Sequence, residues 1–339
     1  MNEVTTVGID LAKNVFQVHG VDARGVVVIR KAIRRVQVLR FFETLPRCLV
    51  GMEACATAHY WARAIAALGH EVRLMPPQYV KAYVKRNKND AADAEAICEA
   101  VRRPSMRFVP VKSAEQQAVL TMHRARELLI RQRTMLVNAL RAHLAEFGIV
   151  GAQGIHRVCD LVAIVADEGD DRVPAIARGV LRIVADQIAV LQTGIAEIDG
   201  RILAWHRTSE VSLRLAAMPG VGPIIASAIA ASVPDASVFR SGREFAAWLG
   251  LVPKQSGTGG KTWLGRISKR GDGYVRRLLI TGALTALTRS RAVKAMPWII
   301  GMKERAKRPM VIAVALANKM ARTAWAMMVR ATAYRASAA

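Results

Sequence analysis

The order of strand and helix patterns in the first hundred residues restricts the fold of this chain more than any other feature. Three strands are predicted in succession, at TVGIDLA (6–12), VFQVHGVD (15–22) and VVVIRKAI (26–33), because apolar residues run together or alternate there. A turn at 22–25 joins the last two, and a helix is predicted over 36–45. The three strands therefore form a meander at the start of the chain.

The rest of this N-terminal region alternates strand and helix. CLVGMEA (48–54) and EVRLMPP (71–77) predict two further strands, and the amphipathic segment HYWARAIAALGH between them predicts a helix that ends near Gly69. A meander followed by alternating helix and strand is typical of layered ribonuclease-H-like folds. We therefore predict an α/β domain of this type over residues 1–110.

The remainder of the chain has a helical pattern. Leucines recur at near-helical spacing over 113–146, and a second long helix is predicted over 174–205, with a less regular stretch at 148–172 between them. These two segments predict a coiled-coil arm over 111–208, although an ordinary helix bundle has the same pattern. A mainly helical third domain is predicted over 209–339.

The charge of the chain indicates a polyanionic partner. Lys and Arg number 50 against 26 Asp and Glu, a formal net charge of +24. Such an excess favours nucleic acid, with an anionic membrane surface as the lesser option. The N-terminus has no signal-peptide pattern and no segment reaches about 18 uninterrupted apolar residues, so we expect a cytoplasmic protein without a membrane span. The four cysteines lack CxxC spacing, which predicts reduced core residues.

Four acidic residues occupy positions where carboxylates can converge. Asp10 and Glu53 end predicted strands, and Asp90 and Asp93 begin a predicted helix after the last strand. Helix residues three apart share a face, so the last two carboxylates repel each other unless a cation neutralises them. Carboxylates are the ligands that Mg²⁺ prefers, and two such ions can stabilise the attacking and leaving oxygens at a phosphodiester.

Each of these acids also has an ordinary structural explanation. Asp10 can cap a turn, Glu53 can be a solvated strand end, and Asp90 with Asp93 can cap and charge a helix start. It is the four together, in this order on this fold pattern, that predict a metal site. Basic residues beside the last pair predict a cationic rim for a phosphate backbone: Arg86, Lys88, Arg102 and Arg103.

Two glycine-containing motifs in the third region point to phosphate contacts. PGVG, with Gly220 and Gly222, lies between two predicted helices and matches a helix-hairpin-helix, whose backbone N–H groups can meet a DNA phosphate. An αα-corner without a ligand is the other interpretation. The segment 253–277 predicts a pliable basic loop, in which Ser256 or Thr258 is placed to attack phosphorus and form a covalent DNA–protein link. A basic loop that orders only on DNA fits equally well. Its predicted DNA-binding residues are Lys254, Lys261, Arg266, Lys269, Arg270, Arg276 and Arg277.

These motifs, in this order, resemble the DEDD transposases of bacterial insertion sequences, in the insertion sequence 110 family of bridge-RNA-guided recombinases. The resemblance extends over nearly the whole chain. It rests on GIDLAK (8–13), MEAC (52–55), KNDAADAEAI (88–97), MPGVGPIIA (218–226), GLVPKQ (250–255) and GRISKRGD (265–272).

The resemblance implies a Holliday-junction-resolvase-like domain, a coiled-coil arm and a C-terminal transposase domain. It also implies excision and insertion of a mobile element by DNA strand exchange, in a homo-oligomer between dimer and tetramer. The family's four acids correspond to Asp10, Glu53, Asp90 and Asp93, with Mg²⁺ as the implied cofactor. A structured noncoding RNA from the element is implied to select the DNA sites by base pairing.

The resemblance further implies a C-terminal serine nucleophile, and here the sequence departs from the family pattern. Relatives usually carry this serine four or five residues after the proline of GLxP, where this chain has Gly257 and Thr258, and Ser256 comes one residue early. We predict Ser256 as the nucleophile, with Thr258 as the alternative. A weakened or differently organised site is also open.

Three other functions each fit part of this sequence. A purely hydrolytic two-metal nuclease, such as a junction resolvase, would use the acids and need no hydroxyl nucleophile. A non-catalytic nucleic-acid scaffold would need only the basic charge. An actin-like phosphotransferase also begins with an acid after its first strand, but no glycine-rich adenosine motif follows here.

Overall fold

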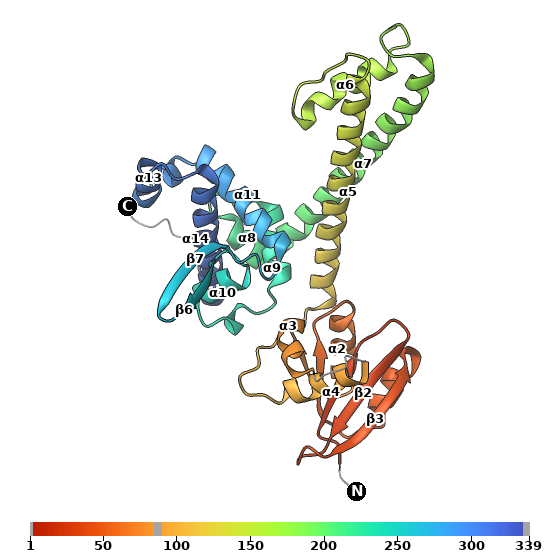
Figure 1. Ribbon diagram of the computed structural model, residues 1–339, viewed down its shortest axis with the longest axis vertical. Helices are drawn as coiled ribbons and strands as arrows, with labels where there is room; N and C mark the ends of the chain where they lie inside the picture. Colours follow the sequence, from red (N-terminus) through yellow and green to blue (C-terminus); the bar gives the residue numbers. More distant parts are fainter. Residues whose placement is uncertain (1–2, 85–89, 335–339) are drawn as a thin grey trace. The chain divides into compact units, whose positions relative to one another are not determined.

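The computed structural model describes residues 3–84 and 90–334. They form two compact units (Figure 1). Unit 1 comprises Met1–Gln117 with Val233–Val238, and unit 2 comprises Ala118–Ser232 with Phe239–Ala339. The predicted order, a mixed α/β region followed by a mostly helical one, is confirmed.

Unit 1 is built on one five-stranded sheet with the order β3-β2-β1-β4-β5. The first three strands are antiparallel neighbours, and the last two run parallel to the first. All five strands were predicted from the sequence. Their bounds are β1 Thr6–Asp10, β2 Val15–Val21, β3 Val27–Arg34, β4 Leu49–Glu53 and β5 Glu71–Met75.

Helices cover both faces of this sheet. On one face, α1 and α2 pack on the apolar side chains of the central strands, with Val7, Met52 and Trp61 in one buried cluster. On the other face, α4 lies across β1, β2 and β4. The helices of unit 1 are α1 Val38–Glu43, α2 Ala58–Ala66, α3 Pro77–Val80 and α4 Asp90–Val101, with 3-10 turns at Arg35–Gln37 and Lys81–Tyr83.

Two glycines allow α4 to approach the sheet closely. A Cβ on Gly8 of β1 would lie 2.3 Å from the carbonyl oxygen of Ala94, and one on Gly51 of β4 would lie 2.8 Å from Cβ of Val101. Both contacts are shorter than real Cβ contacts, so only glycine fits at either position. Because side chains alternate along a strand, Gly8 lies on the same face as Asp10, and Gly51 on the same face as Glu53. The helix that these glycines admit therefore lies on the face that carries the acids.

Unit 2 contains the long helices. The helix α5 (Ala114–Ala145), which begins in unit 1, and α7 (Ala175–Thr208) run in opposite directions, with α6 (Val158–Ala166) at their far end (Figure 1). Their shared core contains Leu140 of α5, Leu161 of α6 and Ile188 of α7. In the described part of the chain, α7 alone is long and apolar enough to cross a membrane by length and composition, a test that core helices also pass. The expected absence of a membrane span stays a prediction.

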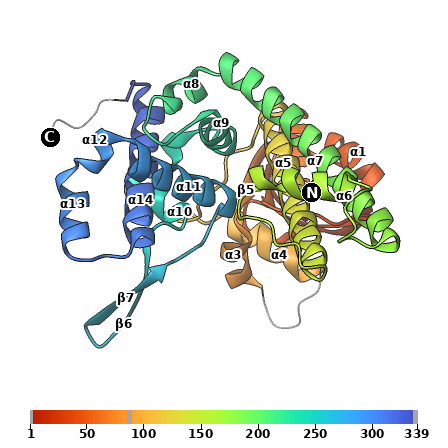
Figure 2. The ribbon, with the colours of Figure 1, turned by 90° about the horizontal axis from the view of Figure 1, so that it is seen from above.

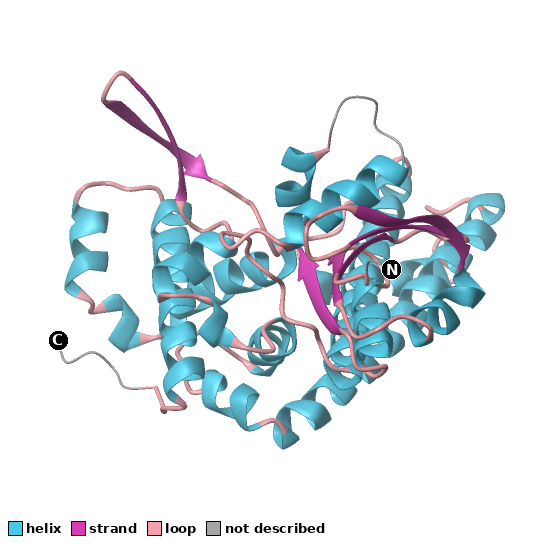
Figure 3. Ribbon diagram, turned by 90° about the horizontal axis from the view of Figure 1, so that it is seen from below, coloured by secondary structure: helices cyan, strands magenta, loops and turns pink. Residues whose placement is uncertain are grey.

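The remaining elements of unit 2 form a helical body with one hairpin. The helix α11 packs on α14, which also contacts α10. The hairpin of β6 and β7 extends away from these helices (Figures 2 and 3). The bounds are α8 Glu210–Ala216, α9 Pro223–Ser232, α10 Gly242–Trp248, β6 Pro253–Thr258, β7 Lys261–Ile267, α11 Gly273–Arg289, α12 Arg291–Lys294, α13 Pro297–Glu304 and α14 Pro309–Arg330, with 3-10 turns at Ile155–Arg157 and, in unit 1, Ala236–Val238.

A buried polar network ties α11, the helix that follows the hairpin, to its neighbours. His123 of α5 is fully buried, with Nδ1 3.0 Å from the Tyr274 hydroxyl and Nε2 3.0 Å from Oγ of Ser227. Ser227 donates its own proton to the Pro223 carbonyl at 2.6 Å, so Nε2–H donates to Ser227 and Tyr274 donates to Nδ1. Burial lowers the pKa of His123 to about 4, which keeps the ring neutral. The start of α11 is thereby fixed to α5 and α9.

The four cysteines are free. Cys48 and Cys98 are buried, as predicted, and burial raises the pKa of each thiol to about 11. Cys55 and Cys159 are exposed, so their prediction as core residues is wrong. Cys55 lies between β4 and α2, and Cys159 lies on the exposed face of α6.

Candidate functional site

Three of the four predicted acids lie together at one edge of unit 1. Asp10 ends β1, and Asp90 and Asp93 begin α4. One carboxylate oxygen from each lies within 4.8 Å of the others. Oxygens at this separation are close enough to bind one cation, and the three side chains are exposed or only half-buried, which leaves the position accessible.

Glu53, the fourth acid, ends the neighbouring parallel strand β4. The paired residues Ile9 and Met52 immediately precede Asp10 and Glu53, so the two acids leave the sheet side by side. Glu53 is outside the group of three close carboxylates, but its charge acts on Asp10. We therefore define the acidic cluster as Asp10, Asp90 and Asp93, with Glu53 beside it.

The acidic cluster is electrostatically strained without a cation. Burial, followed by repulsion from Asp93, Asp90 and Glu53, raises the pKa of Asp10 to about 6. The backbone N–H of Leu11 lowers the pKa of Asp10 only in part. A divalent cation would reverse this repulsion, so the donor set fits a hard metal ion.

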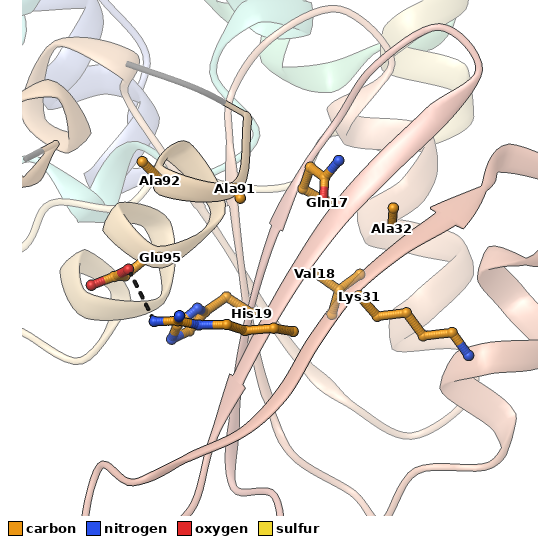
Figure 4. Close-up of a pocket in the computed structure, with 9 residues that line it drawn as sticks. Gln17, Val18, His19, Lys31, Ala32, Ala91, Ala92 and Glu95 are labelled. Atoms are coloured by element: carbon orange, nitrogen blue, oxygen red, sulfur yellow. Dashed lines mark ion pairs between the residues drawn. The ribbon is translucent and has the colours of Figure 1, made fainter. Parts of the chain in front are cut away.

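A cavity of about 420 Å³ lies against the same end of α4. Figure 4 shows Gln17 and His19 of β2 facing Ala91, Ala92 and Glu95 of α4. Gln17 is the direct cross-strand partner of Asp10, so the cavity adjoins the acidic cluster. Its lining also includes Arg30, which pairs with Glu95 at 3.5 Å, whereas the Lys31 side chain points away from α4. The sequence pattern did not predict these residues, because strand alternation alone gives no signal for a cavity.

The predicted cationic rim is described only in part. Arg86 and Lys88 lie outside the described residues. Arg103 pairs with Glu99 on α4, and its guanidinium lies 6.0 Å from the ring centre of Tyr83. Arg103 therefore has partners within unit 1 itself.

The predicted loop over 253–277 is wrong for most of its length. Residues Pro253–Thr258 and Lys261–Ile267 form an antiparallel hairpin, and α11 begins at Gly273. The two turn residues Gly259 and Gly260 both have positive φ, at 54° and 77°, as a two-residue turn that matches strand twist requires. The signal was present in the sequence, because Gly-Gly between two β-forming segments predicts such a hairpin.

Both predicted hydroxyl nucleophiles lie on this hairpin, which we call the basic hairpin (residues 253–267). Ser256 and Thr258 are exposed on β6, as are nearly all residues of both strands. The hairpin also carries three of the predicted DNA-binding residues, all exposed: Lys254, Lys261 and Arg266. The acidic cluster belongs to unit 1 and the basic hairpin to unit 2.

The other predicted DNA-binding cations are placed at the base of the basic hairpin. Lys269 and Arg270 are exposed. Arg276 donates to the carbonyl oxygens of Leu249 and Arg270, at 2.9 and 2.8 Å, so it holds the base together. Arg277 pairs with Glu127 and lies over the Tyr274 ring.

The PGVG turn joins α8 and α9, and its two glycines have different surroundings. Gly220 has φ of 86°, and a Cβ there would lie 2.4 Å from the carbonyl oxygen of Gly282 in α11. Gly220 therefore serves close packing against α11. Gly222 is exposed, with nothing near its Cβ position, and its backbone adjoins the start of α9.

Comparison with known proteins gives a consistent result along the chain. Residues 7–149 match a family model described as a transposase, of the DEDD type, and residues 212–296 match the transposase IS116/IS110/IS902 family. A probable family 20 transposase of Pseudomonas aeruginosa is 52% identical over 98% of this chain and 99% of its own length. The transposase for insertion sequence element IS1328 of Yersinia enterocolitica is 41% identical over 98% and 99%. That for IS1111A of Coxiella burnetii is 38% identical over 100% and 93%.

Proposed function

Because this chain belongs to the insertion sequence 110 family of transposases, we propose that it cleaves and exchanges DNA strands with the acidic cluster of unit 1 and a hydroxyl of the basic hairpin. The family makes the chain a DNA transposase, and DNA its partner. The observation that carries the proposal is the convergence of Asp10, Asp90 and Asp93 within 4.8 Å. The roles of the acids are inferred from this geometry, and the roles of the hairpin residues from the family resemblance and from their exposure.

The acidic cluster is proposed to hold Mg²⁺, with Glu53 completing the ligand set. Three oxygen donors, repelling one another at a half-buried strand end, fit a hard divalent cation. When bound, the ion supplies positive charge beside the attacked phosphate. In the proposal, Asp10 is fixed by the sheet, while Asp90 and Asp93 are placed by the approach of α4 to Gly8 and Gly51.

The sheet of unit 1 supports a ribonuclease-H-like, junction-resolvase-like assignment. Three antiparallel strands pair with two parallel ones in the order β3-β2-β1-β4-β5, and helices cover both faces. Acids that end adjacent strands of such a sheet lie at one edge, as Asp10 and Glu53 do. We propose this fold for the domain predicted over 1–110.

Ser256 is proposed as the nucleophile, with Thr258 as the alternative. In the proposed step, a bond forms between the hydroxyl oxygen and phosphorus, and the bond from phosphorus to one sugar oxygen breaks. The released sugar hydroxyl gains the proton that the serine loses, so the reaction is a transfer without net hydrolysis. The primary hydroxyl of Ser256 is less hindered than that of Thr258, and both are exposed.

Exposed cations and one helix start are proposed to hold the DNA backbone. The basic hairpin presents Lys254, Lys261 and Arg266, and Lys269 and Arg270 continue this charge at its base. The turn before α9 is proposed as a helix-hairpin-helix in which the exposed backbone at Gly222 meets a phosphate. Gly220, which packs on α11, serves to shape that turn.

Two further features are proposed on the family resemblance and on charge. One is guidance by a structured RNA from the element, whose phosphates the +24 charge of the chain would attract. The other is a homo-oligomer between dimer and tetramer, in which the predicted coiled-coil arm over 111–208 joins copies. RNA that co-purifies with the expressed chain, sequenced and matched to the flanks of its gene, tests the first.

The metal role is tested by strand exchange between two duplexes with purified full-length protein, its RNA and Mg²⁺. Asp10→Asn and Asp93→Asn should each lower the rate about 1,000-fold, since each removes a ligand charge at the reacting phosphate. Glu197→Gln is the matched control, because Glu197 is an exposed acid of α7 that pairs with Arg201 on its own helix. Full activity of Asp10→Asn would contradict the metal site.

A further inference from the structure

The basic hairpin has two distinct faces, and its register shows which residues share them. Ser256 pairs directly with Trp263, and Thr258 with Lys261. Directly paired residues project to the same side, with Cβ atoms about 5 Å apart. Both candidate nucleophiles therefore share one face with Trp263 and Lys261. The opposite face carries the pairs Gln255 with Leu264 and Gly257 with Thr262.

Trp263 is the large aromatic side chain on this face. It is 54% exposed, and its cross-strand neighbour Ser256 is too small to cover an indole ring. Core packing therefore does not account for a tryptophan here. A nucleobase has the shape that a flat, exposed indole ring binds, because every base offers a π face.

The charge and chemistry of the same face favour a nucleic-acid ligand. Lys261 lies two residues from Trp263 on the same face, where its ammonium group can meet a backbone phosphate, and the chain is a DNA transposase. Base stacking on an aromatic ring combined with phosphate contact to a cation is the usual arrangement of single-strand binding surfaces. The ligand that this combination fits is an unstacked DNA nucleotide.

We propose that Trp263 is a base-stacking residue, whose indole ring holds the nucleobase beside the DNA phosphate that Ser256 attacks. The inference rests on the proposed role of Ser256 for its location, and on the exposed ring and adjacent cation for its ligand. Stacking fixes the nucleotide next to the hydroxyl, about one cross-strand spacing away. Stacking tolerates any base, so Trp263 would position the strand without selecting its sequence.

The test uses the full-length protein and a mixed-sequence single-stranded DNA oligonucleotide that contains 2-aminopurine, a fluorescent base that is quenched by stacking. Binding should quench this base with the unaltered protein and with Trp263→Phe, which keeps an aromatic face. Trp263→Ala should lose the quenching and weaken binding by about 5-fold or more. Leu264→Ala is the matched control, since Leu264 is the next residue, is 70% exposed and lies on the opposite face.

The salt dependence of DNA affinity distinguishes a lost stacking contact from a lost phosphate contact. Trp263→Ala should leave the slope of log affinity against log salt unchanged, whereas Lys261→Ala should reduce it by about 0.7. Unaltered affinity and quenching in Trp263→Ala would overturn the proposal. Equal losses in Leu264→Ala would overturn it as well. If 2-aminopurine is quenched in an RNA oligonucleotide but not in the DNA oligonucleotide, the site binds RNA instead of DNA.

The outcome for Trp263 can be told apart from the outcome for Ser256. Ser256→Ala should retain the quenching, because the hydroxyl does not form the stacking surface. If strand cleavage survives in Ser256→Ala while Trp263→Ala loses quenching, the nucleophile assignment fails and base stacking stands. With an element-end substrate, 2-aminopurine next to the cleaved phosphate should be quenched more than the same base ten nucleotides away, and equal quenching would overturn the proposed location.

Discussion

The acidic cluster of unit 1 and the basic hairpin of unit 2 are positioned in opposite ways. The acids are placed by tight packing, in which α4 approaches the sheet at Gly8 and Gly51. The hairpin is exposed along nearly its whole length and holds its shape through strand pairing and a Gly-Gly turn. Substitutions that alter the packed part should therefore affect folding and chemistry together, whereas substitutions on the hairpin should affect DNA binding or chemistry and leave folding unchanged.

The largest contrast is expected between the two hydroxyls of the hairpin. Ser256→Ala should lower the yield of covalent protein–DNA adduct by about 1,000-fold or more, as loss of a nucleophile does. Thr258→Ala should change the yield by less than about 10-fold, and neither variant should alter the melting temperature, because both side chains are exposed. Adduct is quantified on denaturing gels, and the reverse ranking of the two variants would move the nucleophile to Thr258.

The close approach of α4 to the sheet predicts that a larger residue at position 8 destabilises unit 1. Gly8→Ala should lower the free energy of unfolding by about 1–3 kcal/mol, because its Cβ would collide with the backbone of α4. Gly265→Ala on the hairpin is the control, since its Cβ would meet Lys254 only at an ordinary 3.7 Å, and it should change stability by less than about 0.5 kcal/mol. Urea titrations measure both, and equal effects would show that α4 is not held by close approach.

The raised pKa of Asp10 predicts how stability depends on pH without divalent cations. Its pKa of about 6 exceeds the ordinary 3.8, so the folded chain binds this proton more tightly than the unfolded chain does. The contribution of Asp10 is therefore fully present below pH 4 and is lost as pH rises through about 6.

Mg²⁺ should restore that lost stability above pH 6, because it replaces the proton as the neutralising charge. Asp10→Asn should melt at a higher temperature than the unaltered protein at pH 7 in EDTA, and should gain less from added Mg²⁺. Calorimetric melting curves at pH 4.5 and 7 measure this. A melting temperature that Mg²⁺ raises equally in both proteins would argue against binding at Asp10.

The smallest effect is expected from single cations at the base of the hairpin. Arg270→Gln should weaken DNA binding without sequence preference and lower the salt slope by about 1, as loss of one phosphate contact does. Arg276→Gln should instead lower the melting temperature, because Arg276 donates to two backbone carbonyls. Filter-binding titrations over a salt series distinguish the two variants. A salt slope that Arg270→Gln leaves unchanged would show that Arg270 does not contact a DNA phosphate.

The sequence predicted the sheet of unit 1 well because its strands have strong local patterns. Alternating or continuous apolar residues define β1 to β5, and helical spacing defines α4, so Asp10, Asp90 and Asp93 could be expected at one edge before their distances were known. The family was confirmed by comparison over nearly the whole chain. The metal role of the acids stays a prediction.

Other features could not be read from local patterns, or were misread. The close contacts at Gly8 and Gly51, and the cavity beside Gln17, depend on tertiary packing that strand alternation does not encode. The basic and glycine-rich composition of residues 253–267 favours a loop, although the Gly259-Gly260 pair is the turn of the hairpin that forms. A loop has no register, so composition alone does not predict the pairing of Ser256 with Trp263.

Peptide mapping of the protein–DNA adduct by mass spectrometry, with and without Mg²⁺, tests the joint role of the acidic cluster and the basic hairpin most directly. We expect a nucleotide attached to Ser256, formed with Mg²⁺ and absent from Asp10→Asn. Mg²⁺-dependent DNA cleavage without an adduct, persisting in the double variant Ser256→Ala with Thr258→Ala, would contradict this joint role and indicate a hydrolytic nuclease.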